Sequence, residues 1–486
     1  MSAGKKEAKG DTVGMTVPKK DFSEWFTEVI KKAELADLRY NAKGFLVHRP
    51  WSVLCMKEMY RLYEGELERR CHMPVWFPAV IPESNFKKEA EHIEGFEPEL
   101  FWVTHAGSDE LTERLALRPT SETAMYTMYS KWVRSWRDLP LKLYQSCQVW
   151  RCDTKATRPF IRGREFHWIE AHDVFATEEE AKNQVKEDME MTEVIMHREF
   201  GVPFISFQRP EWDKFPGAVH TYAADTMMPD GKALQQPSTH LLGQNFAKSF
   251  NIRFKDKDEK EKVAWQTCYG PAIWRMFSSV VALHGDDKGL VFPFKIAPMQ
   301  VAIIPIGGTE KEAYGLQKEL MEAGIRVIVD ASDNTPGWKF NQWEMKGVPI
   351  RIELGPKEVK EGRLTLVRRD TGKKTQVNRK AALKSVLTEG GELTKSIISK
   401  ADNWFTGKIS NASSMKELGE CLKSGGFVRT ELCSVGKDGE ACADRIKDRF
   451  HAEVRGKRID VEEKPKGDCV VCGSKAQEVV YVAKQY

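Results

Sequence analysis

The 486-residue sequence lacks several features that would place it in other protein classes. No apolar run approaches the roughly 20 residues that a membrane-spanning helix needs, so we expect no membrane association. No hydrophobic stretch follows the basic N-terminal segment, so that segment is not a secretory signal. The sequence contains no internal repeat, and its Gly-rich segments match neither a Walker A loop nor a dinucleotide-binding fingerprint. A nucleotide ligand would therefore have to be bound in some other way.

The composition is that of an ordinary globular chain with several domains. Hydrophobic residues make up 41% of the chain and charged residues 30%, and the length predicts about three domains. The net charge of +4 is too small to argue for nucleic-acid binding by itself. We expect a flexible basic tail (1–19), a first domain (20–295) of α+β type on an antiparallel sheet, a compact α/β domain (296–403) in which strands alternate with helices, and a small, separately stabilised α/β domain rich in cysteine (404–486).

The cysteines are unevenly distributed. Five of the ten follow residue 420, and four of these form two pairs, Cys433-x8-Cys442 and Cys469-x2-Cys472. Two such pairs suit a tetrahedral four-thiolate zinc site that would stabilise a small domain. A reduced, metal-free set of thiols is the open alternative, and Cys421 is expected to be a bystander. The scattered remaining cysteines are typical of core positions, which indicates a reducing, cytoplasmic compartment.

The stretch 117–172 places polar and aromatic side chains where a core strand would carry aliphatic ones. Six residues alternate at strand period and would point to one face: Arg162, Arg164, Phe166, Trp168, Glu170 and His172. Guanidinium, carboxylate and imidazole groups beside flat rings indicate a pocket for an anionic, partly aromatic ligand, as in an enzyme that binds a nucleotide. The alternatives are structural ion pairs for the arginines, core packing for the aromatics and hydrogen-bonded structural roles for the histidines.

Several long motifs resemble one enzyme family. They are FPAVIP (77–82), LRPTSE (117–122), RPFIRGREFHWIEAHD (158–173), THLLGQNF (239–246), HGDDKGL (284–290) and PGWKFNQWEMKGVPIRIELGP (336–356), together with the final Tyr486. In this respect the chain resembles the class II aminoacyl-tRNA synthetases, and most closely the archaeal and eukaryotic-cytosolic type of prolyl-tRNA synthetase. The resemblance covers about 20–486. It implies a class II catalytic domain (20–295), an anticodon-binding domain (296–403) and a C-terminal domain (404–486) with similar cysteines.

The resemblance also implies the activity and its ligands. Such enzymes activate L-proline with ATP and Mg²⁺ to prolyl-adenylate and transfer it to the 3′ end of tRNA(Pro). They work as cytoplasmic homodimers, here with the interface on helix 50–70 and FPAVIP. The alternatives are a synthetase with relaxed specificity or specific for cysteine or alanine, and a non-catalytic synthetase-like protein that binds tRNA or regulates a partner.

By resemblance, each site residue has an expected role. Arg151 is the motif 2 arginine that bridges the α-phosphate and the substrate carboxylate, and Arg275 is the motif 3 arginine. The ATP-binding residues are Arg151, Arg162, Phe166, Gln235, Ser238 and Arg275. The amino-acid-binding residues are Thr120, Glu122, Arg151, Trp168, Glu170, His172 and His240. The zinc ligands are Cys433, Cys442, Cys469 and Cys472, and Tyr486 reaches the catalytic domain. Asp153 replaces the usual glutamate of motif 2, and the bulky Trp274 precedes Arg275.

The basic face of the anticodon-binding domain is expected to come from five cations, and two nearby tryptophans either stack on single-stranded bases or belong to the core. The cations are Lys339, Lys346, Arg351, Arg368 and Arg369, and the tryptophans are Trp338 and Trp343.

Overall fold

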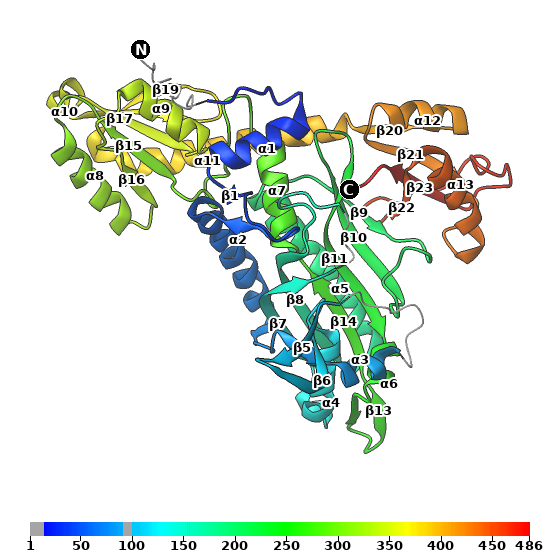
Figure 1. Cartoon of the computed structure of the whole chain (residues 1–486). Coiled ribbons are helices and arrows are strands. Elements are labelled where there is room, and N and C mark those ends of the chain that lie inside the picture. Colours follow the sequence, from blue (N-terminus) through cyan, green and yellow to red (C-terminus); the bar gives the residue numbers. More distant parts are fainter. Residues whose placement is uncertain (1–13, 91–99, 153, 155) are drawn as a thin grey trace, which may run out of the picture. The chain divides into compact units, whose positions relative to one another are not determined.

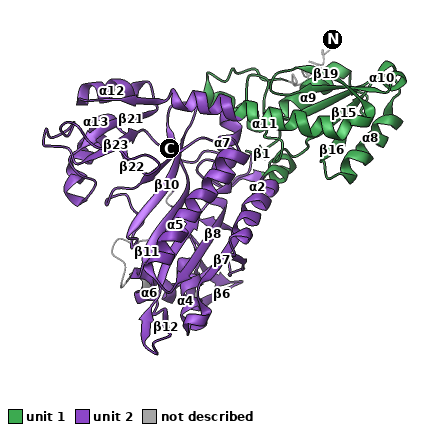
Figure 2. Ribbon diagram, turned by 180° about the vertical axis from the view of Figure 1, so that it is seen from behind, with its two compact units in different colours: residues 1–38, 48–55, 284–397 green, residues 39–47, 56–283, 398–486 purple. Residues whose placement is uncertain are grey.

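The structure, a computed structural model, describes residues 14–90, 100–152, 154 and 156–486 (Figure 1). The chain divides into two compact units, shown in green and purple in Figure 2. The smaller unit contains residues 1–38, 48–55 and 284–397, and the larger contains 39–47, 56–283 and 398–486. Each unit is built around its own sheet.

The larger unit is organised around an eleven-stranded sheet. Its strands, in spatial order, are β20 (Ile409–Asn411), β21 (Phe427–Leu432), β23 (Glu478–Ala483), β22 (Glu453–Arg458), β9 (Ile205–Gln208), β10 (His220–Met227), β11 (Ala233–Gly243), β14 (Trp265–Gly270), β8 (Glu165–Phe175), β7 (Leu141–Trp150) and β3 (Met73–Pro74). The strands from β9 to β7 pair antiparallel, which confirms the predicted fold class. Only short flanking strands pair parallel within this sheet, β3 with β7 and β20 with β21.

Helices and a second small sheet complete this unit. The helices are α2 (Pro50–Arg69), whose residues 50–55 belong to the smaller unit, α3 (Glu83–Ala90), α4 (Glu122–Trp132), α5 (Glu178–Thr192), α6 (Asn245–Ser249) and α7 (Ile273–His284), and a π-helical turn (Glu193–Glu199) continues α5. The small sheet has the order β4 (Val80–Pro82), β6 (Asp109–Leu117) and β5 (Trp102–Ala106). The strand β4 lies at its edge, as Pro78 and Pro82 predict. The charge run 254–263 forms a hairpin of β12 (Arg253–Lys255) and β13 (Glu261–Val263).

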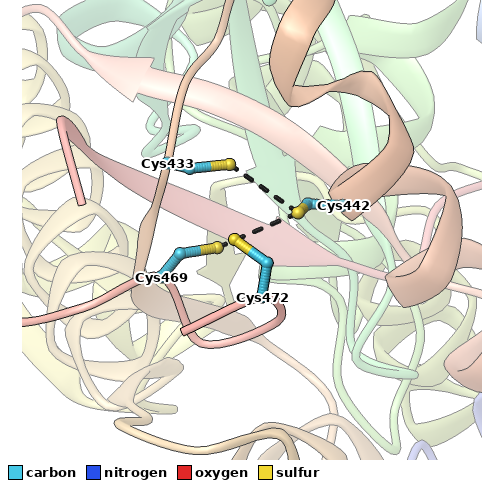
Figure 3. Close-up of side chains that lie close together, drawn as sticks. All are labelled: Cys433, Cys442, Cys469 and Cys472. Carbon is cyan, nitrogen blue, oxygen red and sulfur yellow. Dashed lines mark hydrogen bonds between the residues drawn. The ribbon is translucent and has the colours of Figure 1, made fainter. Parts of the chain in front are cut away.

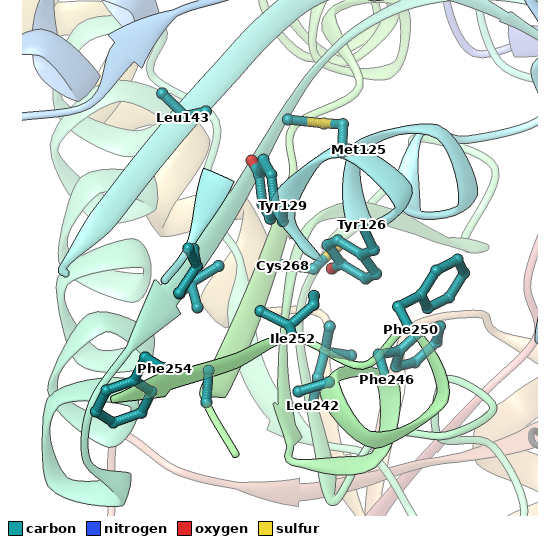
Figure 4. Packing of buried hydrophobic residues seen from close by; sticks show 14 of the residues in the cluster. Met125, Tyr126, Tyr129, Leu143, Leu242, Phe246, Phe250, Ile252, Phe254 and Cys268 are labelled. Carbon is teal, nitrogen blue, oxygen red and sulfur yellow. The ribbon is translucent and has the colours of Figure 1, made fainter. Parts of the chain in front are cut away.

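The core beneath the sheet explains why α4 forms where it does. Met125, Tyr126 and Tyr129 recur at helical spacing and are fully buried against Leu242 and Phe246 (Figure 4). The Tyr129 hydroxyl donates to the main-chain oxygen of His172, 2.9 Å away. This packing fixes the start of α4, and therefore Thr120 and Glu122, relative to β8.

The C-terminal segment continues the large sheet. Helices α12 (Met415–Lys423) and α13 (Glu440–Phe450) bury a core of their own, with Leu418 and Ile446. Strand β22, however, pairs with β9, where a Cβ at Gly456 would lie 2.0 Å from the main-chain oxygen of Gln208. The expectation of a separately stabilised domain is therefore wrong in one respect, because its strands share the sheet of the larger unit.

The smaller unit is the predicted α/β arrangement. Its five-stranded sheet has the order β16 (Val327–Val329), β15 (Val301–Pro305), β17 (Ile350–Leu354), β18 (Arg363–Arg368) and β19 (Lys374–Asn378). Strand β15 pairs parallel with both neighbours, and the other pairs are antiparallel. The helices are α1 (Phe22–Lys32), α8 (Glu310–Glu322), α9 (Pro336–Met345), α10 (Pro356–Glu361) and α11 (Ala382–Thr406), and two short strands are β1 (Ala36–Asp37) and β2 (Val47–His48).

The described part of the expected N-terminal tail is anchored. The main-chain nitrogen of Thr16 donates to Glu28 at 3.1 Å, and Lys19 Nζ donates to the main-chain oxygen of Gly285 at 2.5 Å. Residues 1–13 of that tail lie outside the described residues. Within the described part of the chain, no helix combines the length and the apolar character required to span a bilayer.

Candidate active site

Two adjoining cavities lie in the larger unit, and residues on or next to β8, β11 and β14 line them. We name the first, of about 240 Å³, the arginine cavity, and the second, of about 310 Å³, the carboxylate cavity. Four residues line both cavities: Arg151, Phe166, Gln235 and Arg275. A ligand with two parts can therefore occupy both cavities at once and meet the same side chains at the junction.

The arginine cavity collects three guanidinium groups from separate elements. Arg151 follows β7, Arg162 lies in the turn before β8, and Arg275 lies in α7. Burial and the nearby charges of Arg151 and Arg162 lower the pKa of Arg275 from 12.5 to about 10. Three guanidinium groups that repel one another indicate a site for a multiply charged anion, because a bound anion would offset the repulsion.

Flat and apolar side chains form the rest of the arginine cavity. The guanidinium carbon of Arg151 lies 5.3 Å from the ring centre of Phe166. Ile161, Leu234 and Trp274 add apolar wall. Arg275, one residue after Trp274, lines both cavities. A group combining phosphates with an aromatic base suits this lining.

The last residues of the chain close the arginine cavity. Tyr486 lines it, and its hydroxyl donates to Asp230 at 2.5 Å and accepts from Arg158 at 3.0 Å. The main-chain nitrogen of Tyr486 also donates to the oxygen of Ala233 at 3.2 Å. The C-terminus is therefore part of this cavity.

The carboxylate cavity is built around Thr120, Glu122 and Glu170. The Thr120 hydroxyl donates to Glu170 at 2.7 Å and also contacts Glu122. Burial raises the pKa of Glu170, but His172 and the hydroxyls around it outweigh burial and lower that pKa overall. Ser121 stands at the N-cap position of α4 but donates its hydroxyl to Glu170 and caps no main-chain N–H. Two buried carboxylates, one held ionised, favour a cationic group between them.

Cys268 lies at the floor of this cavity. It is buried, and its Sγ donates to Glu122 Oε1 at 3.3 Å. Trp168 stands on β8 beside Phe166 and lines the cavity wall. A small apolar body attached to a cation would fit between the ring and the carboxylates.

The two histidines differ in position. His240 lines the carboxylate cavity, and its ring nitrogens lie 2.9 Å from Thr221 Oγ1 and 3.2 Å from Ser238 Oγ. Burial, with the charges of His172 and Arg209, lowers the pKa of His240 to about 3, so its ring is neutral.

His172 lines neither cavity, which corrects its expected place in the wall. It lies behind Glu170, with its Nε2 3.9 Å from Glu170 Oε1 and its Nδ1 3.0 Å from the Tyr126 hydroxyl. Burial lowers the pKa of His172, but the facing carboxylates outweigh burial and raise that pKa overall. Its cation therefore helps to keep Glu170 ionised from behind the cavity.

The strand period of 162–172 holds over only part of that stretch. Strand β8 begins at Glu165, so Arg162 and Arg164 precede it. The chain turns at 159–161 and bends at Arg164, whose main-chain nitrogen donates to the main-chain oxygen of Gly44 at 2.8 Å. The prediction that all six side chains share one strand face is therefore wrong, although Arg162 still reaches the arginine cavity. Asp153 lies outside the described residues.

Sequence reasoning missed many of the lining residues, and among these Arg209 and Asp213 are charged. Arg209 and Asp213 follow β9 and belong to none of the quoted motifs. Arg209 and Asp213 lie near the cavity because β9 pairs with β10, and no local sequence pattern predicts that pairing.

Comparisons with known proteins bear on all parts of the chain. Residues 101–284 match the family described as tRNA synthetase class II core domain (G, H, P, S and T), residues 300–389 match the anticodon binding domain, and residues 415–486 match the prolyl-tRNA synthetase C-terminal family. The proline--tRNA ligase of Thermofilum pendens is 52% identical over 483 residues, which cover 97% of this chain and 99% of that protein. The chain belongs to the prolyl-tRNA synthetase family.

Solved structures of the family agree over the full length. A Giardia lamblia prolyl-tRNA synthetase in complex with prolyl-adenylate is 37% identical, with a TM-score of 0.92, and the match covers 98% of this chain and 100% of that one. A Cryptosporidium parvum prolyl-tRNA synthetase complexed with halofuginone and AMPPNP is 31% identical, with a TM-score of 0.91 and the same coverage. These matches confirm the predicted fold class of this prolyl-tRNA synthetase family member.

The four C-terminal cysteines form a compact cluster (Figure 3). The Sγ atoms of Cys433, Cys442, Cys469 and Cys472 all lie within 4.8 Å of one another, with 3.7 Å between Cys433 and Cys442. Zinc–sulfur bonds of about 2.3 Å in a tetrahedron place sulfurs about 3.8 Å apart, so this donor set fits zinc. Cys421, expected as a bystander, is not among them and contacts the main-chain oxygen of Asn411.

The expected basic face of the anticodon-binding region is not supported by the contacts of its cations. Each of the five cations is bonded within the smaller unit, namely Lys339 to the Asp330 main chain, Lys346 to Glu34, Arg351 to Glu344, Arg368 to Asp370 and Arg369 to Asp286. Trp343 is buried, with its indole nitrogen 2.9 Å from Asp330, whereas Trp338 is 37% exposed. Internal ion pairs account for four of these cations, and a hydrogen bond to the main chain accounts for Lys339.

Proposed function

We propose that this chain is a proline--tRNA ligase, which activates L-proline with ATP to prolyl-adenylate and transfers it to the 3′ end of tRNA(Pro). The observation that carries the proposal is the junction of the two cavities. Arg151 and Arg275 line both cavities there, and they lie between the cluster of cations in the arginine cavity and the pair of carboxylates in the carboxylate cavity. A reaction between an anionic phosphate and a zwitterionic amino acid requires that arrangement.

The arginine cavity binds ATP with its Mg²⁺. Phe166 stacks on adenine, Arg162 and Arg275 hold phosphate oxygens, and Gln235 lies beside the nucleotide. Ser238 lines the carboxylate cavity next to His240, so it would contact ATP from that side. The carboxylate oxygen of proline attacks the α-phosphorus, the bond to the β-phosphate bridging oxygen breaks, and pyrophosphate leaves. Arg151 lines both cavities and can bridge the two reacting groups. Fixed cations stabilise the charge spread over the transition state without reorganisation.

The carboxylate cavity binds proline. Thr120 and Glu122 receive the protonated secondary amine, Glu170 holds the Thr120 hydroxyl, and Trp168 and His240 form the wall around the ring. Because His240 is neutral, it adds no charge that would repel the amine. His172 acts behind Glu170 and does not touch the substrate.

Further parts of the proposal concern metal, assembly and compartment. Cys433, Cys442, Cys469 and Cys472 would hold a structural zinc ion, which would tie the loop after β21 to the segment before β23. We also propose a homodimer that forms through α2 and the FPAVIP segment, since Met73 and Trp76, in the segment that joins these two elements, are 63% and 92% exposed in the single chain. The ten cysteines are free thiols, in keeping with a cytoplasmic location.

The predicted domain bounds, 20–295, 296–403 and 404–486, are retained in the proposal. Each of the three family matches falls inside one of them. The two alternatives, a cysteine- or alanine-specific or relaxed synthetase and a non-catalytic tRNA-binding regulator, are not supported by the comparisons, in which the curated relatives are proline--tRNA ligases. The test is proline-dependent exchange of pyrophosphate into ATP by the purified protein, and no exchange with any amino acid would contradict the proposal.

A further inference from the structure

A buried ion triad adjoins the two cavities. Asp225, on β10, is fully buried between Arg209, after β9, and Arg455, on β22. Arg209 Nη1 and Nη2 donate to the two oxygens of Asp225 at 3.0 and 2.6 Å, and Arg455 Nε donates at 2.7 Å. Burial raises the pKa of Asp225, but the two arginines outweigh burial and lower it to about 2, so the carboxylate is ionised.

Arg209 lines the carboxylate cavity, yet its terminal nitrogens are committed to the protein. Besides Asp225, Nη1 donates to the main-chain oxygen of Arg455 at 2.8 Å, and Nη2 donates to Gln235 Oε1 at 3.3 Å. Each terminal nitrogen carries two hydrogens, and these four contacts use all of them. The remaining Nε lies 3.8 Å from Asp213. Arg209 therefore has no terminal hydrogen left for a substrate.

The contact between Arg209 and Gln235 fixes the orientation of a carboxamide. A guanidinium can only donate, so the group that faces it must be the amide oxygen and not the amide nitrogen. The nitrogen of Gln235 is then directed away from Arg209. Gln235 lines both cavities, where Arg151 and Arg275 are its neighbours, and its main-chain oxygen accepts from Arg275 at 3.3 Å.

We propose that Arg209, clamped by Asp225 and Arg455, is a positioning residue that holds the Gln235 side chain with its amide N–H toward the reacting anion. This inference rests on the proposed function. The anion is either the α-phosphate of ATP or the carboxylate of proline, which share the need for an N–H donor. If the amide were free to flip, its oxygen would face that anion and repel it.

The clamp includes the C-terminal segment. The Arg455 guanidinium also contacts the side chain of Gln485, and Gln485 lines the arginine cavity next to Tyr486. The segment that carries the cysteine cluster thus contributes one of the two cations that hold Asp225. Removing one arginine leaves a one-to-one buried ion pair, so the single variants Arg209→Met and Arg455→Met keep a charge-balanced core.

The experiment is a double-mutant cycle on proline-dependent ATP–pyrophosphate exchange with Arg209→Met, Gln235→Ala and the double variant. Arg209→Met is expected to lower kcat/KM by on the order of 10-fold or more, as for loss of a fixed donor. In the Gln235→Ala background, Arg209→Met is expected to lower kcat/KM by less than about 2-fold, because the carboxamide that Arg209 orients is already absent. Fully additive losses would mean that Arg209 acts in another way and would overturn the proposal.

A second variant does not depend on how Arg209 variants fold. Gln235→Glu keeps an oxygen for Arg209 but replaces the N–H donor with a second oxygen, so exchange is expected to fall further than for Gln235→Ala. Exchange by Gln235→Glu at the wild-type rate would overturn the proposal. A rise in KM for ATP alone identifies the phosphate as the anion, and a rise in KM for proline alone identifies the carboxylate.

Arg458→Met is the matched control. Arg458 also lies on β22 and is paired with a carboxylate, Asp460, but lines neither cavity. It is expected to leave the kinetic constants unchanged, and a loss equal to that of Arg209→Met would point to a general effect of removing an arginine from this part of the sheet, which would overturn the specific role. Absence of proline-dependent exchange in the wild type would instead contradict the proposed function itself, so the two failures are distinguishable.

Discussion

The substitution Arg275→Met separates the effect of the arginine cluster on the stability of the fold from its effect on catalysis. The pKa of Arg275 falls from 12.5 to about 10 because the residue is buried beside Arg151 and Arg162. At about 1.4 kcal/mol per pKa unit, this corresponds to roughly 3 kcal/mol of unfavourable free energy in the ligand-free protein. The cation is present in both folded and unfolded states below pH 10, so its removal relieves this cost throughout the neutral range.

The variant should lose activity without losing stability. Loss of the hydrogen bond to the Gln235 main chain costs about 1 kcal/mol, so the free energy of unfolding should stay the same or rise by ~1–2 kcal/mol. Proline-dependent exchange should fall by about 10²–10³-fold, which corresponds to roughly 3–4 kcal/mol of lost transition-state stabilisation. Thermal melting and the exchange assay, on the same preparation, measure the two effects.

Arg118→Met is the matched control with the opposite expected effect on stability. Arg118 is buried outside both cavities and donates to the main-chain oxygens of Gln148 and Phe77 at 2.9 and 2.8 Å. Its removal takes the Arg118 donor from two partly buried carbonyl groups and should destabilise the fold by about 1–3 kcal/mol. If Arg275→Met destabilised the protein as much as Arg118→Met, or retained normal exchange, the reasoning about the cluster would be wrong.

Three further predictions follow from single groups. Glu122→Gln should raise KM for proline about 10-fold or more and change KM for ATP little, since an ion pair with the amine is lost; equal changes in both constants in the exchange assay would contradict this role. Burial and the charge of Asp173 raise the pKa of Asp188 from 3.8 to about 7, so folding takes up a proton between these pH values and stability falls as pH rises through them. Asp188→Asn should therefore stabilise the protein more at pH 8 than at pH 5 in thermal melting, and a pH-independent difference would refute the assignment. Elemental analysis should find about one zinc per chain, lost in Cys469→Ser and kept in Cys421→Ser; a fully folded, metal-free wild type would count against the site.

Much of the fold could be predicted because long segments carry a single periodicity. The start of α2 at Pro50, the core face of α4 and the alternation of strands and helices after residue 299 all follow from local patterns. The junction of the C-terminal strands with β9 could not be predicted. It depends on the close approach of Gly456 to Gln208, a long-range pairing with no local signal.

The candidate site could be predicted for residues that lie in the family motifs. It could not be predicted for residues that reach the site only through long-range packing. Strand period placed Phe166, Trp168 and Glu170 on one face, but it did not show that β8 begins only at Glu165. His172 keeps that period and is nevertheless covered by Glu170 and Tyr126. Arg209 reaches the cavity through an ion triad whose members are far apart in sequence.

The most direct test of the central claim is the amino-acid dependence of ATP–pyrophosphate exchange by the purified wild-type protein. Proline, alanine and cysteine are compared at equal concentrations with ATP and Mg²⁺. We expect exchange with proline to exceed that with the other two by at least about 10-fold in kcat/KM, since differences of a methylene or two are worth about 1–3 kcal/mol each. Exchange that is absent with proline, or equally fast with alanine or cysteine, would contradict the account.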